Sequence, residues 1–410
     1  MAATAPPDAH RFETDLRSAL QLASASSTAK HQRAQHAIFE RWKDFCSRHH
    51  VSPSLSDVLD AKTKLSYLLV FGYRYRQTGQ RNQRVRADQV EAALLAVGQG
   101  ISHLGQPDPR KEVPGSERNH PLLASFYKAM RDEDDPASRV YPVNITILRG
   151  LPQALDTDHP VYGTLNTHVI NLIIVGFYWL LRPAEYVHGD PEACSQAFRY
   201  RDIHFTIDNC VVHAPTASLN DKKLARIQNA TLTFSDQKNA VRGEQIGHKA
   251  NADPFFCPAK ALARLALHLQ RAGATPDTPI HMHYNPAHRK WYPVKPQHVT
   301  NALRHSATVL KAQTGIDPHL ISARSLRSGG ATALLCANQD PNKIQLLGRW
   351  KSDAMFRYLR IQADPTNFAQ LMLDHGAFTF TPTTTQLIQP LPEQTPPELR
   401  LLMARDELYS

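Results

Sequence analysis

Residues 321–360, ISARSLRSGGATALLCANQDPNKIQLLGRWKSDAMFRYLR, combine two arginines, a run of small residues and a tyrosine. Arg324 and Arg327 stand three positions apart, and both precede the run SGGAT at 328–332. Small residues let another backbone, or a phosphate, come close. Tyr358 follows near the end of the segment. This pattern indicates a phenol nucleophile presented beside a pair of cations.

Two further features lie between the arginines and the tyrosine. The sequence LGRW at 347–350 ends in Trp350, which we expect to pack over the site and to offer its indole N–H to an anionic oxygen. Met355, Phe356 and Leu359 are spaced as on one side of a helix. They predict a buried helical face next to Tyr358.

The order and spacing of these residues resemble the C-terminal box of the tyrosine recombinase (phage-integrase-like) family. That box contains a basic residue three positions before an arginine, a Leu-Gly pair before a His or Trp, and a tyrosine. The sequence GRWKSDA at 348–354 is most similar to recombinases of eukaryotic mobile elements, Crypton-like or Ngaro-like. The resemblance covers residues 10–375. It implies a DNA strand-transfer enzyme, an integrase in DNA integration or recombination, that works through a 3′-phosphotyrosyl intermediate on Tyr358.

A second arginine motif follows the most apolar run of the chain, residues 169–181. Arg182, in the sequence LRPAE, stands where Pro183 stops a simple helical continuation. A snorkelling arginine at a helix end is the structural alternative. The resemblance implies that Arg182 and Arg327 clamp the non-bridging oxygens of the scissile phosphate. Glu185 is placed to pair with Arg182 and fix its planar fork.

Between the two arginine motifs the hydrophobic period changes from helix to strand. Short strands are expected at 202–207, 210–213, 230–234 and 245–249, with a turn at Asp208 and Asn209. Lys238, in QKNAVRG, lies on the last hairpin, where lysines are usually solvated. The resemblance implies that Lys238, rather than Lys222 or Lys223, protonates the leaving 5′ oxygen.

The resemblance is incomplete at Arg324, where most family members have histidine. An arginine donates to a phosphate but does not act as a base in proteins. A DNA-binding protein derived from a recombinase, but catalytically silent, is therefore the main alternative. A relaxing enzyme similar to type IB topoisomerases is a third possibility. In the purely structural reading, Tyr358 is a core aromatic residue and the arginines are surface charges.

The N-terminal third is expected to be helical and to contact DNA. A segment between its second and third helices, RYRQTGQRNQRVR at 74–86, contains no acidic residue. We expect its arginines to form a phosphate track, with a solvated loop as the alternative. These residues are Arg74, Arg76, Arg81, Arg84 and Arg86.

The fold class is predicted to be mostly α with a small antiparallel sheet. Residues 1–9 are expected to be disordered, 10–135 to form a helical, SAM-like core-binding domain with its linker, 136–376 the catalytic domain, and 377–410 a Pro- and Thr-rich tail. The resemblance implies that the two domains form a C-shaped clamp around DNA. It also implies that the tail links protomers, so self-association as a dimer or tetramer is expected.

Composition fits a polyanionic partner. The net charge is +10 and the pI is near 9.4, which favours double-stranded DNA over an acidic partner. The five cysteines are scattered singly, as in a reducing compartment. No secretory signal is expected, because the N-terminal residues lack an apolar run, and no membrane span is expected, because the run 169–181 is too short. The resemblance implies a nuclear location in a eukaryote and a cytoplasmic one otherwise.

No cofactor or metal ion is expected. His281, His283 and His288 form a His-x-His pair with a third histidine, which in other settings binds a metal. Only Asp277 lies nearby as a carboxylate, and the chain contains 21 histidines. The proposed chemistry also needs no nucleotide or metal, and no small-molecule cofactor is implied.

Overall fold

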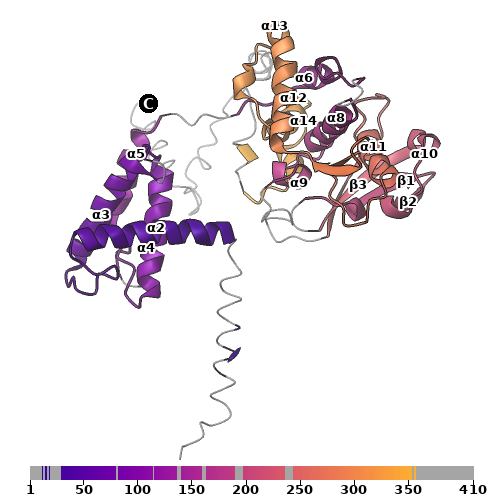
Figure 1. The fold of residues 1–410 in the computed structure, drawn as a ribbon. Coiled ribbons are helices and arrows are strands. Elements are labelled where there is room, and N and C mark those ends of the chain that lie inside the picture. The colour runs from indigo at the N-terminus through magenta and orange to yellow at the C-terminus, as the bar shows by residue number, and fades with distance from the viewer. Residues whose placement is uncertain are drawn as a thin grey trace, which may run out of the picture.

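The computed structural model describes residues 12, 14–15, 18, 29–79, 82–113, 115–135, 140–158, 163–189, 197–235, 243–352 and 355–356. Within these residues the chain is mostly helical and contains one four-stranded antiparallel sheet and one two-stranded sheet (Figure 1). The expected combination of helices with a small antiparallel sheet is thereby confirmed. No helix of the described residues is long and apolar enough to cross a bilayer.

The N-terminal helices pack around their own core. They are α2 (Ala29–Arg48), α3 (Ala61–Thr78), α4 (Ala87–His103) and α5 (Pro121–Asp132). Trp42 is fully buried between the rings of Phe45 and Phe71, whose centroids lie 5.4 and 5.3 Å from its own. Asp60 caps α3 by accepting from the backbone N–H groups of the first turn. Leu59 precedes α3 and is 97% exposed.

The remaining described residues form a second body with a larger core. Its helices are α6 (Ile145–Arg149), α7 (Leu151–Ala154), α8 (Gly163–Tyr178), α9 (Pro183–Tyr186), α10 (Asp221–Ala225), α11 (Pro258–Arg271), α12 (Pro296–Val309), α13 (Lys311–Thr314), α14 (Ser325–Cys336) and α15 (Pro341–Gly348), with 3₁₀ turns at Tyr200–Asp202, Ala214–Thr216 and Pro318–Leu320. The nearly all-apolar α8 lies in the middle of this body, in contact with α11, α12 and α14. Burial on most of its sides explains why its sequence shows little amphipathic pattern.

The main sheet has the strand order β2-β1-β3-β4, and every neighbouring pair is antiparallel. Its strands are β1 (Ile203–Ile207), β2 (Cys210–His213), β3 (Ile227–Phe234) and β4 (Glu244–Lys249). Asp208 and Asn209, with φ of 53° and 62°, form the tight turn of the expected first hairpin. The third strand begins three residues before its predicted start, and α11 packs against it.

A second, two-stranded sheet was not expected. It consists of β5 (Met282–Asn285) and β6 (Lys290–Pro293), in a stretch for which no strand was predicted. His283 faces the core from β5 and is 2% exposed. The short strands carry too few residues for their alternation to stand out in the sequence.

The two cores are separate within the described residues. The first contains residues from Ile38 to Met130, and the second contains residues from Val143 to Leu326. The domain bounds 10–135 and 136–376 stay predictions. The predicted N-terminal segment 1–9 and the C-terminal tail 377–410 lie outside the described residues.

Candidate functional site at the end of helix α8

The candidate site is built around the junction between α8 and α9, residues 179–182. Leu180 adopts a left-handed conformation there, with φ of 50°, which turns the chain out of α8 and exposes its carbonyl group to donors from elsewhere. The Trp179 indole N–H donates to the carbonyl of Ile246 at 2.8 Å and so ties the junction to β4. The Tyr186 hydroxyl donates to the carbonyl of Ala323, just before α14. The junction is thereby fixed to both neighbouring elements.

Arg182 and Glu185 form the expected pair. The Arg182 Nη1 lies 3.0 Å from Glu185 Oε1, and the Arg182 backbone N–H donates to Glu185 Oε2 at 2.7 Å. The carboxylate therefore caps α9 and holds the guanidinium at the same time. The Glu185 side chain is 5% exposed, whereas that of Arg182 is 24% exposed. Arg182 thus keeps part of its cation available to solvent.

Arg327, on α14, reaches the same junction from the opposite end of the sequence. Its guanidinium donates to the carbonyls of Leu180 and Gly348. The ring of Trp350 covers it, with its centroid 4.1 Å from the guanidinium carbon. Arg327 is 3% exposed and Trp350 is 9% exposed. Trp350 therefore packs over Arg327 through a cation–π contact.

The small residues after Arg327 allow this close packing. A Cβ on Gly329 would lie 2.0 Å from the carbonyl oxygen of Val143, and one on Gly330 would lie 2.4 Å from that of Phe177. Backbone, rather than a phosphate, occupies the space that these glycines leave. At Gly348 a Cβ would lie 1.6 Å from the ring of Trp350. These glycines bring α8, α14 and Trp350 together.

Arg349 is a member of the site that the sequence did not assign to it. It ends α15 in a left-handed conformation, with φ of 57°, and its Nη2 lies 3.0 Å from Glu185 Oε2. Its Nη1 donates to the carbonyls of Trp179 and Leu347, both at 3.2 Å. Burial lowers the pKa of this guanidinium, and the Glu185 carboxylate opposes the shift.

The other predicted catalytic residues stand differently. Arg324 is exposed at the start of α14, and no side-chain partner for it occurs within the described ranges. Lys238, in the connection between β3 and β4, and Tyr358 lie outside the described residues, as does Leu359. Met355 is buried with Trp350. Phe356 is 58% exposed, so its predicted place in a buried face is wrong.

The predicted arginine track is only partly a surface feature. Arg76 lies in α3, is 2% exposed, and its Nη1 lies 3.1 Å from Asp134 Oδ1. Its assignment to DNA contact is therefore wrong, because the acidic end of α5 holds it in the interior. Arg84 and Arg86 are about half exposed and lie 3.1 and 4.0 Å from Glu133 and Asp134. Arg81 lies outside the described residues.

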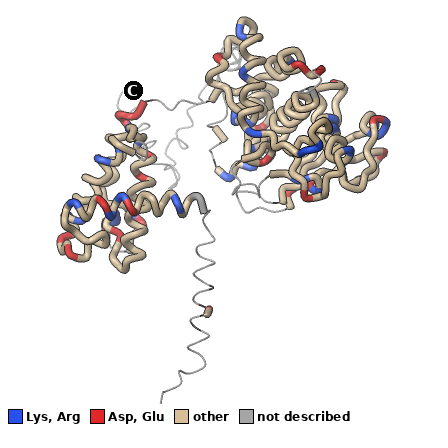
Figure 2. Tube along the Cα trace, in the orientation of Figure 1, with Lys and Arg blue, Asp and Glu red and all other residues tan. Residues whose placement is uncertain are grey.

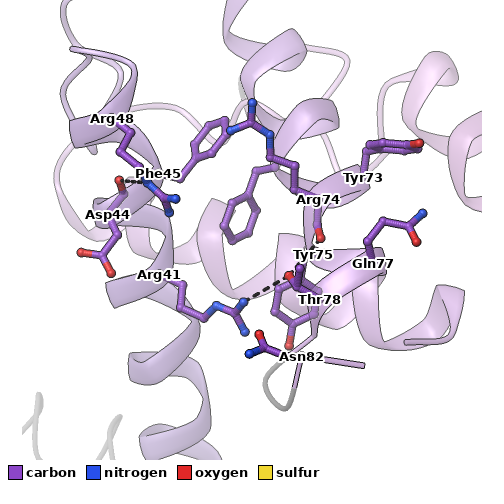
Figure 3. Close-up of a pocket in the computed structure, with 11 residues that line it drawn as sticks. Arg41, Asp44, Phe45, Arg48, Tyr73, Arg74, Tyr75, Gln77, Thr78 and Asn82 are labelled. Carbon is purple, nitrogen blue, oxygen red and sulfur yellow. Dashed lines mark hydrogen bonds between the residues drawn. The ribbon is translucent and has the colours of Figure 1, made fainter. Parts of the chain in front are cut away.

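Arg74 remains exposed, and it lines a groove between α2 and α3 with a volume of about 370 Å³ (Figure 3). Arg41 and Arg48, on α2, face the same groove. Each of these side chains has partners within the described residues. Arg41 donates to the carbonyl of Gly79 and to the hydroxyl of Thr78, and Arg48 donates to the carbonyl of Asp44. Arg74 Nη1 lies 2.9 Å from His49 Nε2, and its guanidinium carbon lies 5.5 Å from the centroid of the Phe45 ring. The groove also contains Tyr73, Gln77 and Asn82. Figure 2 shows the basic and acidic residues that alternate over these helices.

Three histidines lie close together within the described residues, although no metal site was expected. The structure brings His283 together with His168 and His268, whose nitrogens lie within 4.8 Å of one another, and not with His281 and His288 as a ligand set. The rings of His268 and His283 are nearly parallel, 8° apart, so one ion cannot lie in both ring planes. The backbone N–H of Tyr284 also donates to His268 Nε2 at 3.0 Å. This arrangement fits neutral, packed imidazoles better than metal ligands.

Comparison with known proteins gives distant structural similarity only. No protein-family model matches the chain, and no curated protein does. A solved structure of a lambda integrase dimer bound to a COC′ core site is 12% identical over 86% of this chain and 94% of that chain, with a TM-score of 0.44. XerH site-specific recombinase bound to difH is 12% identical over 78% of this chain and 71% of that chain, with a TM-score of 0.42. The Tn1549 transposon integrase in complex with transposon right end DNA is 11% identical over 78% of this chain and 87% of that chain, with a TM-score of 0.40. Similarity this remote assigns no function to the chain.

Proposed function

We propose that this protein is a DNA strand-transfer enzyme, a tyrosine recombinase or integrase that cuts and rejoins duplex DNA. The observation that supports it most is the convergence of Arg182 and Arg327. These arginines come from distant parts of the sequence to one junction, where Trp350 covers Arg327. Tyr358 follows Trp350 closely in the chain. Two planar cations fixed within one buried frame suit a phosphodiester better than a solvated surface would.

The proposed chemistry addresses two reasons why a phosphodiester reacts slowly with nucleophiles. Its anionic oxygens repel nucleophiles, and its leaving alkoxide is poor. Arg182 and Arg327 stabilise the charge of the pentacoordinate transition state, each donor contributing on the order of 10²–10³ in rate. The phenol oxygen of Tyr358 attacks phosphorus and the bond to the 5′ oxygen breaks. Lys238 gives a proton to that oxygen, and the 3′-phosphotyrosyl bond conserves the energy for rejoining.

The proton of Tyr358 must also leave, because a free phenol has a pKa of about 10 and is mostly protonated at neutral pH. Arg324 holds the position where the resembling family has histidine, and an arginine is no base. We propose that Arg324, exposed at the start of α14, donates to the phosphate. A water molecule or a non-bridging oxygen of the scissile phosphate then accepts the phenol proton.

The DNA is proposed to lie against both bodies of the protein, held as in a clamp. On the N-terminal side, Arg41, Arg48 and Arg74 of the α2–α3 groove are suited to contact the phosphate backbone without reading sequence. Arg84 and Arg86 are about half exposed next to α4 and add to this surface, although Glu133 and Asp134 offset part of their charge. Self-association on DNA is part of the proposal, since strand exchange needs two cleaved duplexes held together. The GRWKSDA sequence supports a eukaryotic mobile element as the source, with work in the nucleus.

A catalytically silent DNA-binding protein is the second candidate. Two observations favour it: Arg324 stands in place of the expected histidine, and the guanidinium of Arg327 is engaged with backbone carbonyls under Trp350. For catalysis, Arg327 has to exchange at least one carbonyl for a phosphate oxygen. A silent protein keeps the basic groove and loses nothing when Tyr358 is removed.

A nicked suicide duplex separates these candidates. Cleavage next to the nick releases a short strand, so that the covalent complex accumulates and is seen on a denaturing gel. The element's own terminal sequences and supercoiled plasmid serve as substrates. An adduct with the wild type, and none with Tyr358→Phe at equal DNA binding, is the expected result. Salt-dependent binding without adduct would support the silent protein, and Arg324→His then tests whether histidine restores cleavage.

A further inference from the structure

We propose that Arg349 is a positioning residue that acts on Arg182 through Glu185. The inference rests on the proposed function, because it gives Arg349 a role in presenting Arg182 to a phosphate. Glu185 lies between two guanidinium groups: Arg182 Nη1 is 3.0 Å from Oε1, and Arg349 Nη2 is 3.0 Å from Oε2. One carboxylate therefore orients both arginines.

The two arginines differ in what they can reach. The Arg349 side chain is 3% exposed, and the ring of Phe234 lies 3.9 Å from its guanidinium carbon. The Arg182 side chain is 24% exposed. In this arrangement Arg182 can meet an anion from solvent, whereas Arg349 is enclosed by carbonyls, an aromatic ring and Glu185. Arg349 therefore acts from behind.

Charge gives the contact its consequence. A buried Arg182–Glu185 pair by itself is neutral and offers little attraction to a phosphate. With Arg349 on the other oxygen of the carboxylate, the three side chains have a net charge of +1, and the carboxylate is shared. Arg349 thereby leaves the charge of Arg182 less neutralised, in a site where screening by water is weak.

Arg349 also joins two parts of the site. It immediately precedes Trp350, which covers Arg327, and its Nη1 donates to the carbonyl of Trp179 at 3.2 Å, in the junction that positions Arg182. The segment 348–350 therefore places Trp350 over Arg327 and, through Arg349, also contacts Glu185, which orients Arg182. A shift at residues 348–350 is transmitted to Arg182 through Glu185.

The test compares Arg349→Met and Arg349→Lys with a control arginine that is partly buried and hydrogen-bonded elsewhere in the same body. Arg264 belongs to the same body, and its Nε and Nη2 donate to Asn171 Oδ1 at 2.8 Å and to the carbonyl of Phe255 at 2.9 Å, away from the junction. Arg264→Met therefore removes a partly buried, hydrogen-bonded cation without touching Glu185. All variants are made in the full chain, and thermal unfolding is recorded for each.

Two readouts are used. The first is the rate of adduct formation on the nicked duplex in a single turnover, at saturating DNA. We expect Arg349→Met to slow it about 100-fold, Arg349→Lys about tenfold because one ammonium cannot hold the carboxylate and the carbonyls together, and Arg264→Met less than about threefold.

The second readout does not require cleavage. Inorganic phosphate is titrated while the guanidinium N–H resonance of Arg182, assigned with Arg182→Lys, is followed by NMR. We expect Arg349→Met to weaken phosphate binding about tenfold and Arg349→Lys to keep it within about threefold. If the wild type forms no adduct, the proposed function fails while this titration still decides the role of Arg349. Equal effects of Arg349→Met and Arg264→Met, or wild-type behaviour of both Arg349 variants, would overturn the proposal.

Discussion

The arginines at the end of α8 and those in the α2–α3 groove have the same chemistry and opposite surroundings. Arg327 and Arg349 are nearly inaccessible to water and held by carbonyls, aromatic rings and Glu185. Arg48 and Arg74 are exposed: Arg48 donates to the carbonyl of Asp44, and Arg74 lies against His49 and the ring of Phe45. A cation fixed before its ligand arrives can stabilise a transition state, whereas a mobile surface cation contributes mainly affinity.

The largest difference between the two regions is expected for carboxylates that each bridge two arginines. Glu185, 5% exposed, bridges Arg182 and Arg349, and Glu133, 66% exposed, bridges Arg76 and Arg84. Glu185→Gln leaves the enclosed Arg349 and the partly exposed Arg182 without their shared counterion, so we expect a loss of about 3–5 kcal/mol in the free energy of unfolding. Glu133→Gln is the control, with a loss of about 1 kcal/mol or less. Urea unfolding measures both, and equal losses would remove the contrast.

Within the N-terminal helices, Arg76 and Arg74 should separate in the same way. Arg76 is buried, and its Nη2 donates to the carbonyl of Met130 at 3.0 Å. Arg76→Met strands that carbonyl and Asp134, so we expect a loss of about 2–3 kcal/mol. Arg74→Met should cost about 0.5 kcal/mol or less, as for other exposed sites. Hydrogen exchange of the α2–α5 amides as a function of denaturant measures the free energy of unfolding of this body in both variants. If Arg76→Met unfolds with the wild-type free energy, the Arg76–Asp134 pair does not stabilise the fold.

Acid should weaken the second body before the first. Burial lowers the pKa of His248, His281 and His283 to about 4, and that of His168 falls well below its usual value. No histidine of α2–α5 among the described residues is buried. In the unfolded chain these histidines bind protons from about pH 6.5 downward, whereas in the folded protein they do so only near pH 4. The free energy of unfolding of the second body is therefore highest above pH 6.5 and decreases as the pH falls towards 4. At pH 5, His248, His281 and His283 should each lower the free energy of unfolding by on the order of 1–2 kcal/mol.

Hydrogen exchange at pH 7 and pH 5, corrected for the intrinsic rate, resolves the two bodies in one experiment. His283→Leu should reduce the acid sensitivity of the second body by about one histidine's share. Equal acid sensitivity of α2–α5 and of the second body would contradict the assignment.

The smallest expected effect concerns DNA affinity at the groove. Arg74→Met should raise the dissociation constant for a nonspecific duplex about fivefold and reduce the salt slope by about one. Anisotropy titrations at several salt concentrations measure both values. Arg76→Met, compared where it is folded, should leave the slope unchanged, because its guanidinium faces Asp134 and not solvent.

The sequence predicted the elements more successfully than it predicted which charges face solvent. Strand alternation placed β1 to β4, and the motif around Arg182 correctly paired it with Glu185. The segment at 74–86 looked uniformly basic because its acidic partners, Glu133 and Asp134, lie beyond α4 in the chain. No local pattern reveals such long-range neutralisation.

Arg349 was missed for a related reason. The sequence shows it as part of a motif, but its contact with Glu185 depends on how α15 ends and on the turn at Leu180. The positive φ of an arginine at a helix end has no sequence signature as clear as a glycine would give. The histidine cluster likewise needs three distant elements, α8, α11 and β5, to meet.

The most direct test of the central claim is the single-turnover rate of covalent adduct formation by Arg327→Met and Arg74→Met at saturating nicked duplex. If the buried cations serve chemistry and the groove serves binding, Arg327→Met slows the rate about 10²–10³-fold with little change in DNA affinity. Arg74→Met then lowers affinity and keeps the rate within about threefold. A folded Arg327→Met protein that forms the adduct at the wild-type rate would contradict this account.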